Sequence, residues 1–269
     1  MVMHPLGIEF ISVFGLPPVE FVHLAADLGC RHISTALVGL QLESLGYPPF
    51  SLKEDAALRH ELIAAMAERD VGISLGEGMV IRPGADVSSL TTDLDVMAEL
   101  GAAQVNSVSF ERDRGRTFDQ LALLSQLASE RGLRTTVEMA PGTVIGDLPT
   151  ALAAIEHAGA QLRLCLDTMH WARSGYGASD IDALDPNVIG YVQLSDTTMA
   201  PRLDSYLEEA MYERMAPGDG ELPLRDILAA VAPDVVVGLE IPMRALAEAG
   251  VSAADRLRPC VAGARELMS

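Results

Sequence analysis

The sequence predicts an α/β fold, a (β/α)8 TIM barrel, and three observations lead to it. Short apolar runs rich in Val and Ile recur eight times along the chain. A polar or Gly-containing turn and then a segment with helical spacing follow these runs, which is the pattern of repeated βα units. The length of 269 residues also suits a barrel, a class that often reaches this size as one unit. We therefore expect a single domain over residues 1–269.

The predicted strands are the apolar runs themselves, and they alternate with helices to the end of the chain. They are LGIEFIS (6–12), RHISTALV (31–38), VGISLGEG (71–78), QVNSVSFE (104–111), RTTVEMAP (134–141), LRLCLDTMH (162–170), VIGYVQLSD (188–196) and VVVGLEIPM (235–243). Eight parallel strands with helices between them close naturally into a barrel. A doubly wound sheet more often has fewer strands and a glycine-rich first turn.

The predicted helices carry ordinary start and stop signals. PPVEFVHLAADLG (17–29) has Pro at its start and Gly at its end, and DLPTALAAIEHAG (147–159) offers Asp147 as a cap and Gly159 as a stop. The other helical segments are 51–70, 86–101, 116–132 and 252–267. Two long stretches outside strands and helices, 41–50 and 197–223, follow the second and seventh strands. Because barrel enzymes have their sites at that end of the strands, we expect lids there.

Charge and cysteine content exclude several classes of partner. The formal net charge is −19, from 38 acidic and 19 basic residues, so the chain repels nucleic acid and anionic membrane surfaces. Cys30, Cys165 and Cys260 are odd in number and widely spaced, which favours neither a disulfide framework nor a metal-binding pair. The start MVMHPLGIEF lacks the features of a signal peptide, and no apolar run approaches about 18 residues. We expect a soluble cytoplasmic protein.

Polar side chains with metal-binding chemistry stand where the later strands end. Glu138 ends the fifth strand, Asp167 the sixth with His170 three residues on, and Gln193 and Glu240 end the seventh and eighth. Carboxylates that meet in a partly dry pocket repel one another, so one divalent cation is the simplest explanation. Carboxylate and amide oxygens favour Mg²⁺ or Mn²⁺, with Co²⁺ or Zn²⁺ as alternatives.

Each of these residues also has a structural interpretation. A single Asp or Glu after an apolar run often caps a helix, as Asp196 is expected to do. A glutamine can satisfy a buried backbone group, and a histidine can bond to a loop carbonyl. The GISLG motif (72–76) matches a nucleophile pattern, but Ser74 lies inside a strand, and the only lysine, Lys53, starts a helix. Acyl transfer and Schiff-base chemistry are therefore disfavoured.

The segments VEMAP, LDTMH, VQLSD and LEIPM, which contain the five residues above, resemble the xylose isomerase-like TIM-barrel superfamily of sugar phosphate isomerases and epimerases. The resemblance implies a metal site of Glu138, Asp167, Gln193 and Glu240, with His170 near the substrate. It also implies that the two glutamates move protons. The segment RMAPGDGELPL (214–224) resembles the loop after strand seven in many members, and this similarity makes Arg214 a substrate contact.

The resemblance is compatible with three functions, of which two are enzymatic. The leading one is a metal-dependent isomerase or epimerase of a sugar or related polyol, with Glu77 and Trp171 beside Arg214 in substrate binding. The sugar epimerases usually have His where this chain has Gln193, a difference that favours a lyase resembling 3-dehydroshikimate dehydratase, which acts on a cyclic hydroxy-ketone. A non-catalytic ligand-binding barrel is the third. Superfamily members are often homo-oligomers, although no sequence feature identifies an interface.

Overall fold

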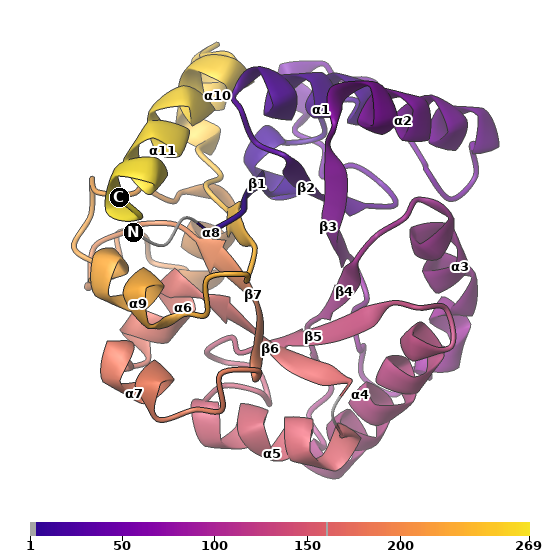
Figure 1. Ribbon diagram of the computed structural model, residues 1–269, viewed down its shortest axis with the longest axis vertical. Helices are drawn as coiled ribbons and strands as arrows, with labels where there is room; N and C mark the ends of the chain where they lie inside the picture. Colours follow the sequence, from indigo (N-terminus) through magenta and orange to yellow (C-terminus); the bar gives the residue numbers. More distant parts are fainter. Residues whose placement is uncertain (1–3, 160) are drawn as a thin grey trace.

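The computed structural model describes residues 4–159 and 161–269 and forms a closed barrel of eight parallel strands in chain order (Figure 1). The predicted fold class is therefore confirmed. The strands are β1 (Leu6–Ile8), β2 (His32–Ala36), β3 (Gly72–Glu77), β4 (Gln104–Ser107), β5 (Arg134–Glu138), β6 (Leu162–Asp167), β7 (Ile189–Leu194) and β8 (Val237–Leu239). Each lies within the run predicted for it. Leu6 of β1 pairs with Val237 of β8, which closes the barrel.

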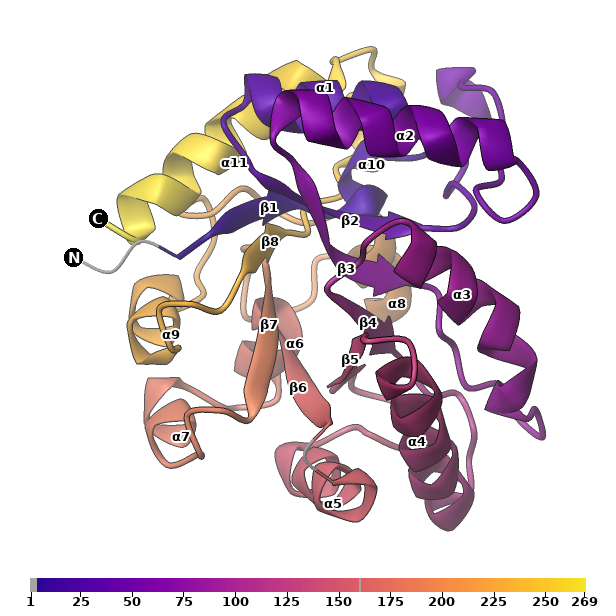
Figure 2. The same cartoon turned by 45° about the vertical axis from the view of Figure 1, so that its right-hand side comes forward.

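Helices surround the barrel, as the two cartoon views show (Figures 1 and 2). They are α1 (Pro18–Asp27), α2 (Ala56–Arg69), α3 (Thr91–Glu99), α4 (Arg114–Ser129), α5 (Leu148–Ala158), α6 (Thr168–Arg173), α7 (Ala178–Asp182), α8 (Tyr206–Tyr212), α9 (Leu224–Ala230), α10 (Arg244–Glu248) and α11 (Ala253–Leu267). Three short 3-10 turns, η1 (Phe10–Val13), η2 (Glu43–Leu45) and η3 (Val87–Leu90), complete the elements. Asp55, Asp113 and Asp147 cap α2, α4 and α5 by accepting backbone N–H groups.

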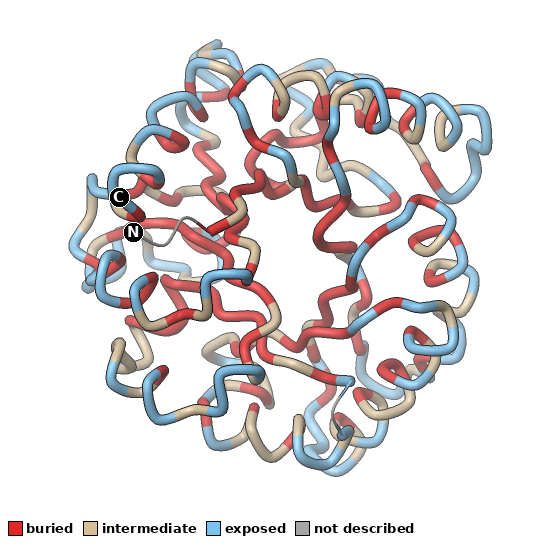
Figure 3. Tube along the Cα trace, viewed as in Figure 1, coloured by how far each residue is buried: buried red, intermediate tan, exposed pale blue. Residues whose placement is uncertain are grey.

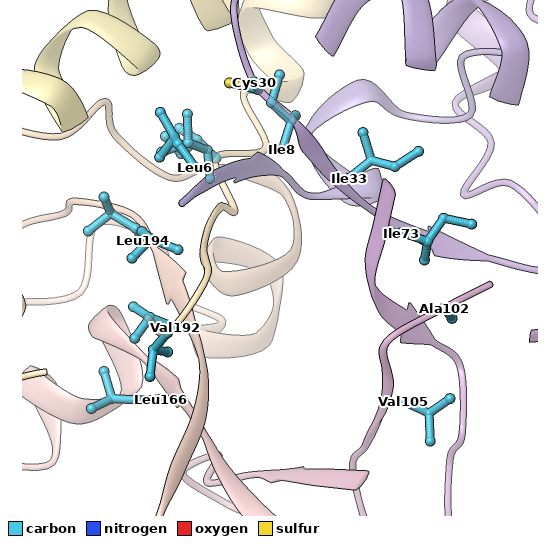
Figure 4. Close-up of a cluster of buried hydrophobic side chains, with 14 of the residues drawn as sticks. Leu6, Ile8, Cys30, Ile33, Ile73, Ala102, Val105, Leu166, Val192 and Leu194 are labelled. Carbon is cyan, nitrogen blue, oxygen red and sulfur yellow. The ribbon is translucent and has the colours of Figure 1, made fainter. Parts of the chain in front are cut away.

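The core lies mainly between the strands and the helices, and the period of two along each strand decides which side chains enter it. Leu166 of β6 and Val192 and Leu194 of β7 belong to this outer core, which Figure 4 shows around the barrel. The alternate residues Cys165 and Tyr191 pack inside the barrel with Leu75. The same inward register continues from Cys165 to Asp167 and from Tyr191 to Gln193, so strand geometry places these two side chains at the site.

The burial pattern follows from this arrangement. The strands are buried almost throughout, while the outer faces of the helices are exposed (Figure 3). Cys30, Cys165 and Cys260 are all buried and free. Within the described part of the chain, no helix combines the length and the apolar character that a membrane span requires.

The connection between β7 and β8 is not purely a loop, because it contains α8 and α9, neither of which was predicted. Ser205 caps α8 by accepting the backbone N–H of Glu208. Asp196 does not cap a helix. Its carboxylate instead accepts backbone N–H groups of Gly218, Gly220 and Leu222 at 2.9–3.1 Å. These hydrogen bonds hold segment 218–222 of the connection close to the end of β7.

Candidate functional site

Glu138, Asp167 and His170 come together at the carboxyl ends of β5 and β6. One ligand atom from each lies within 4.8 Å of the others. The Nε2 atom of His170 is 3.3 Å from Oε1 of Glu138 and 3.9 Å from Oδ2 of Asp167. The spacing of three residues has a local cause, because Asp167 is the N-cap of α6 and accepts the backbone N–H of His170 at 2.9 Å. Capping therefore uses Oδ1 of Asp167 and leaves Oδ2 facing the site.

Arg214 reaches this group from the β7–β8 connection and is 4% exposed. Its Nη1 atom donates to Oδ2 of Asp167 and to Oγ of Ser195, both at 2.8 Å. Its Nη2 atom lies 3.2 Å from Oε2 of Glu240, and its Nε atom donates to the carbonyl of Ala210 at 2.8 Å. The guanidinium thus joins the carboxyl groups of β6 and β8, and its role as a substrate contact stays a prediction.

Gln193 lies at the site but presents its nitrogen to the carboxyl groups. The Nε2 atom donates to Oε1 of Glu77 at 3.2 Å and to Oε1 of Glu240 at 3.1 Å. The Oε1 atom, expected from the sequence to be a metal ligand, accepts the thiol of Cys165 at 3.2 Å. In this orientation Gln193 bridges two carboxyl groups, and its role as a metal ligand stays a prediction.

Asn106 of β4 supplies the other amide of the site, and the sequence analysis missed it. Its Nδ2 atom donates to Oε2 of Glu138 at 3.1 Å and to Oε2 of Glu77 at 3.4 Å, while its oxygen accepts the hydroxyl of Thr136. A carboxylate that follows an apolar run is visible in a sequence, but an asparagine inside a short strand carries no such signal. Glu77, predicted as a substrate contact, is therefore held between two amides, those of Asn106 and Gln193.

The described part of the barrel interior gathers more carboxyl groups than the Arg214 guanidinium pairs with. Burial raises the pKa values of Glu77 and Glu240 well above the usual range, and neighbouring carboxylates raise them further. Burial would also raise the pKa of Asp167, but the Arg214 guanidinium, the neighbouring His170 ring and a backbone hydrogen bond hold it well below the usual range. The site therefore contains carboxyl groups whose pKa values are shifted in opposite directions, a common property of acid–base sites.

A second polar group is centred on Glu9, in the segment after β1. Glu9 is 1% exposed, its Oε1 atom accepts the hydroxyl of Tyr191 at 2.6 Å, and that hydroxyl lies 3.2 Å from Oγ of Ser74. Burial raises the pKa of Glu9 to about 7. The Glu9 carboxyl fits because β8 has a glycine, Gly238, opposite it, and a Cβ there would overlap both Glu9 and Tyr191.

Trp171 is not brought to the site. Its side chain is 1% exposed and belongs to the main core, its ring packs 5.1 Å from that of Tyr176, and its Nε1 atom donates to the carbonyl of Gly177. These contacts pack the indole of α6 against the following segment, and its role as a substrate contact stays a prediction. Ser74 is a buried strand residue, as expected, so the GISLG motif forms no exposed nucleophile.

The model of the family described as xylose isomerase-like TIM barrel matches residues 22–260 of this sequence. The chain belongs to this family. The match covers strands β2 to β8 and includes every residue of the Glu138–Asp167–His170 group. No curated protein matches the chain.

Solved structures share this fold over nearly the whole chain. The IolI protein with a bound zinc atom has a TM-score of 0.80 and 16% identity, and the match covers 98% of both chains. A probable 3-DHS dehydratase from Bacillus anthracis has a TM-score of 0.76 and 16% identity, over 100% of this chain and 99% of the other. A 3-keto-D-glucoside 4-epimerase from E. coli has a TM-score of 0.70 and 17% identity, over 98% and 99%. At these identities the likeness establishes the fold.

Proposed function

We propose that this protein is a divalent-metal-dependent isomerase or epimerase that removes a proton next to the carbonyl of a sugar or related polyol. The observation that carries the proposal is the group of Glu138, Asp167 and His170, whose ligand atoms lie within 4.8 Å of one another at the carboxyl end of the barrel. Zinc in the IolI structure and the activity of the 4-epimerase neighbour support it.

The residues at this end of the barrel fit a divalent cation. Glu138, Asp167 and His170 offer two carboxylates and an imidazole, a set that accepts Mg²⁺ or Mn²⁺ as well as Zn²⁺ or Co²⁺. Oε2 of Glu240 is buried and accepts no hydrogen bond, although the Arg214 guanidinium lies close by, so it has a lone pair to offer. When bound, such a cation polarises the substrate carbonyl and stabilises the charge that develops on its oxygen.

In this proposal Glu138 and Glu240 carry out the two proton transfers. Glu138 is the base in this proposal, because its side chain is the most accessible of the three at 12% and Asn106 holds one of its oxygens. Burial raises the pKa of Glu240, so this carboxyl is suited to hold a proton and to return it to the substrate. Arg214 bridges Asp167 and Glu240 and so fixes the second carboxyl relative to the first.

The test is proton NMR in D₂O with Mg²⁺-loaded protein, with ketohexoses, inositol-derived ketones and 3-dehydroshikimate as substrates, with and without chelator. Metal-dependent deuterium uptake with a new sugar isomer supports the proposal, and new aromatic signals replace it with the dehydratase. Asp167→Asn should abolish the uptake. Asp119→Asn, which removes an exposed carboxylate paired with His157 on the outer helices, should not. If no substrate reacts but Mg²⁺ still raises the melting temperature of wild type and not of Asp167→Asn, the barrel binds metal without this chemistry.

A further inference from the structure

A cavity of about 390 Å³ lies at the end of the barrel opposite the candidate site. Its wall contains the first residue of five strands, β2, β3, β4, β5 and β7, which are His32, Gly72, Gln104, Arg134 and Ile189. Arg163, the second residue of β6, also lines it. The amino ends of the parallel strands share one edge of the barrel, so we call this space the amino-end cavity. Its volume falls within the range of small-molecule sites, about 300–1,000 Å³.

Two arginines of this wall belong to the inner face of the barrel. Arg134 lies four residues before Glu138 on β5, and Arg163 lies four residues before Asp167 on β6. Side chains alternate along a strand, so residues four apart share a face. Cys165, between Arg163 and Asp167, packs inside the barrel and separates the two ends. The inner face therefore carries carboxyl groups at one end and guanidinium groups at the other.

The two guanidinium groups of the amino-end cavity have no anionic partner within the described residues. Arg31, next to His32, pairs with Asp70 at 2.9 Å, but neither Arg134 nor Arg163 forms an ion pair of this kind in that part of the chain. The acidic residue of the lining, Asp234, is exposed. The cavity thus presents unpaired positive charge in a chain whose formal net charge is −19.

Neighbouring groups hold this wall in place and leave one acceptor unused. The stem of Arg163 lies against Gly190 of β7, where a Cβ would come within 3.0 Å of Cβ and 3.2 Å of Cδ of the arginine. Gln104 is 2% exposed, and its Nε2 atom donates to the carbonyl of Gly190 at 3.2 Å. Its Oε1 atom accepts no hydrogen bond from the described residues. A buried acceptor without a donor is costly, so an anion that also carries a hydroxyl hydrogen is favoured here.

We propose that the amino-end cavity binds a phosphate group that retains a hydrogen, either as inorganic phosphate or as the monoester of a small molecule. Arg134 and Arg163 donate to its anionic oxygens, since guanidinium and phosphate form strong charge-assisted hydrogen bonds. The remaining P–OH group donates to Oε1 of Gln104. Sulfate has a similar shape but carries no hydrogen at neutral pH, so it lacks this last contact. The site is separate from the candidate active site and does not depend on the proposed function.

The experiment is isothermal titration calorimetry of the chelator-treated protein with inorganic phosphate at neutral pH and constant ionic strength. Chelator prevents phosphate from binding through a metal ion. The double variant Arg134→Gln/Arg163→Gln should raise Kd about tenfold or more, the cost of one lost hydrogen bond to a charged group. The control Arg82→Gln/Arg258→Gln also removes two positive charges, from exposed residues outside the cavity, and should bind phosphate like wild type. If the double variant does not fold, Arg134→Gln alone, a change at an exposed residue, should show the same direction.

Two further titrations identify the ligand. Sulfate should bind wild type about tenfold more weakly than phosphate, and Gln104→Leu should remove this preference. Glycerol 3-phosphate that binds more tightly than phosphate indicates a monoester as the ligand, and weaker or equal binding indicates the free ion. The proposal is overturned if wild type shows no phosphate binding, if the double variant binds phosphate as tightly as wild type, or if sulfate and phosphate bind equally well.

Discussion

Removal of the Arg214 guanidinium should break its buried ion pair with Asp167 and make the protein more stable when an external cation is bound. The side chain is 4% exposed, and its Nη1 atom lies 2.8 Å from an Asp167 carboxylate whose side chain is fully buried. Breaking a buried ion pair by removing one partner costs about 3–5 kcal/mol, because the remaining charge stays buried without compensation. Arg214→Met keeps the length of the stem and should lower the free energy of unfolding by that amount at neutral pH in chelator.

A divalent cation should then restore part of the loss, since Asp167 and Glu240 no longer face a guanidinium. Binding to the folded state alone stabilises by RT ln(1 + [L]/Kd), or about 2.7 kcal/mol at a hundredfold excess over Kd. Urea unfolding of wild type and Arg214→Met, in chelator and in a Mg²⁺ or Mn²⁺ series, measures both effects. Arg244→Met is the control, because Arg244 pairs with Glu208 at the surface and should contribute less than about 1 kcal/mol. Equal stability of Arg214→Met and wild type, with no response of the variant to cations, would refute the reasoning.

Three further predictions concern groups that the structure buries. The pKa of Glu9 is raised from 4.5 to about 7, so its stabilising contribution is full below pH 4.5 and is lost as the pH rises through 7. In urea unfolding, the stability of Glu9→Gln relative to wild type should therefore rise between pH 5 and pH 8. A difference in unfolding free energy that stays constant over this range would contradict the prediction. Gly238→Ala should lose about 1–3 kcal/mol because the new Cβ overlaps the Glu9 carboxyl, whereas Gly72→Ala on β3 meets no neighbour within 4 Å and should not show this loss. Glu209→Gln, which breaks the buried ion pair between Glu209 and Arg173, should speed hydrogen exchange across residues 197–213. Glu208→Gln, an exposed change on the same helix, should not. Equal exchange in the two variants would show that the buried ion pair does not hold α8.

The barrel was predictable because its signals are local and repeated. Each strand is a short apolar run, and a helix with its own cap follows most of them, so neither tertiary contacts nor long-range pairing had to be known. The helices that the sequence analysis missed, among them α6 and α8, are five to seven residues long, with caps such as Asp167 and Ser205 that read equally well as site or loop residues. Periodicity cannot identify a helix of less than two turns.

The site was predictable at the strand ends and less so between them. Glu138, Asp167 and His170 meet because parallel strands bring their carboxyl ends to one edge, a rule that needs no coordinates. The direction in which an amide points is a different matter. Gln193 turns its nitrogen toward Glu77 and Glu240, whose carboxyl groups accept its N–H groups, and its oxygen toward the Cys165 thiol. Trp171 turns into the core although it follows His170 directly. Both outcomes depend on packing that the order of residues does not reveal.

The order of charges along the chain has a consequence for biosynthesis. Glu9, Glu77, Glu138 and Asp167 all leave the ribosome before Arg214, and Glu240 leaves after it. Domains fold from the N-terminus during synthesis, but this barrel closes only when β8 pairs with β1. Arg214, which pairs with Asp167 and Glu240, is made before β8. The seam of the barrel can therefore close only after this guanidinium has emerged.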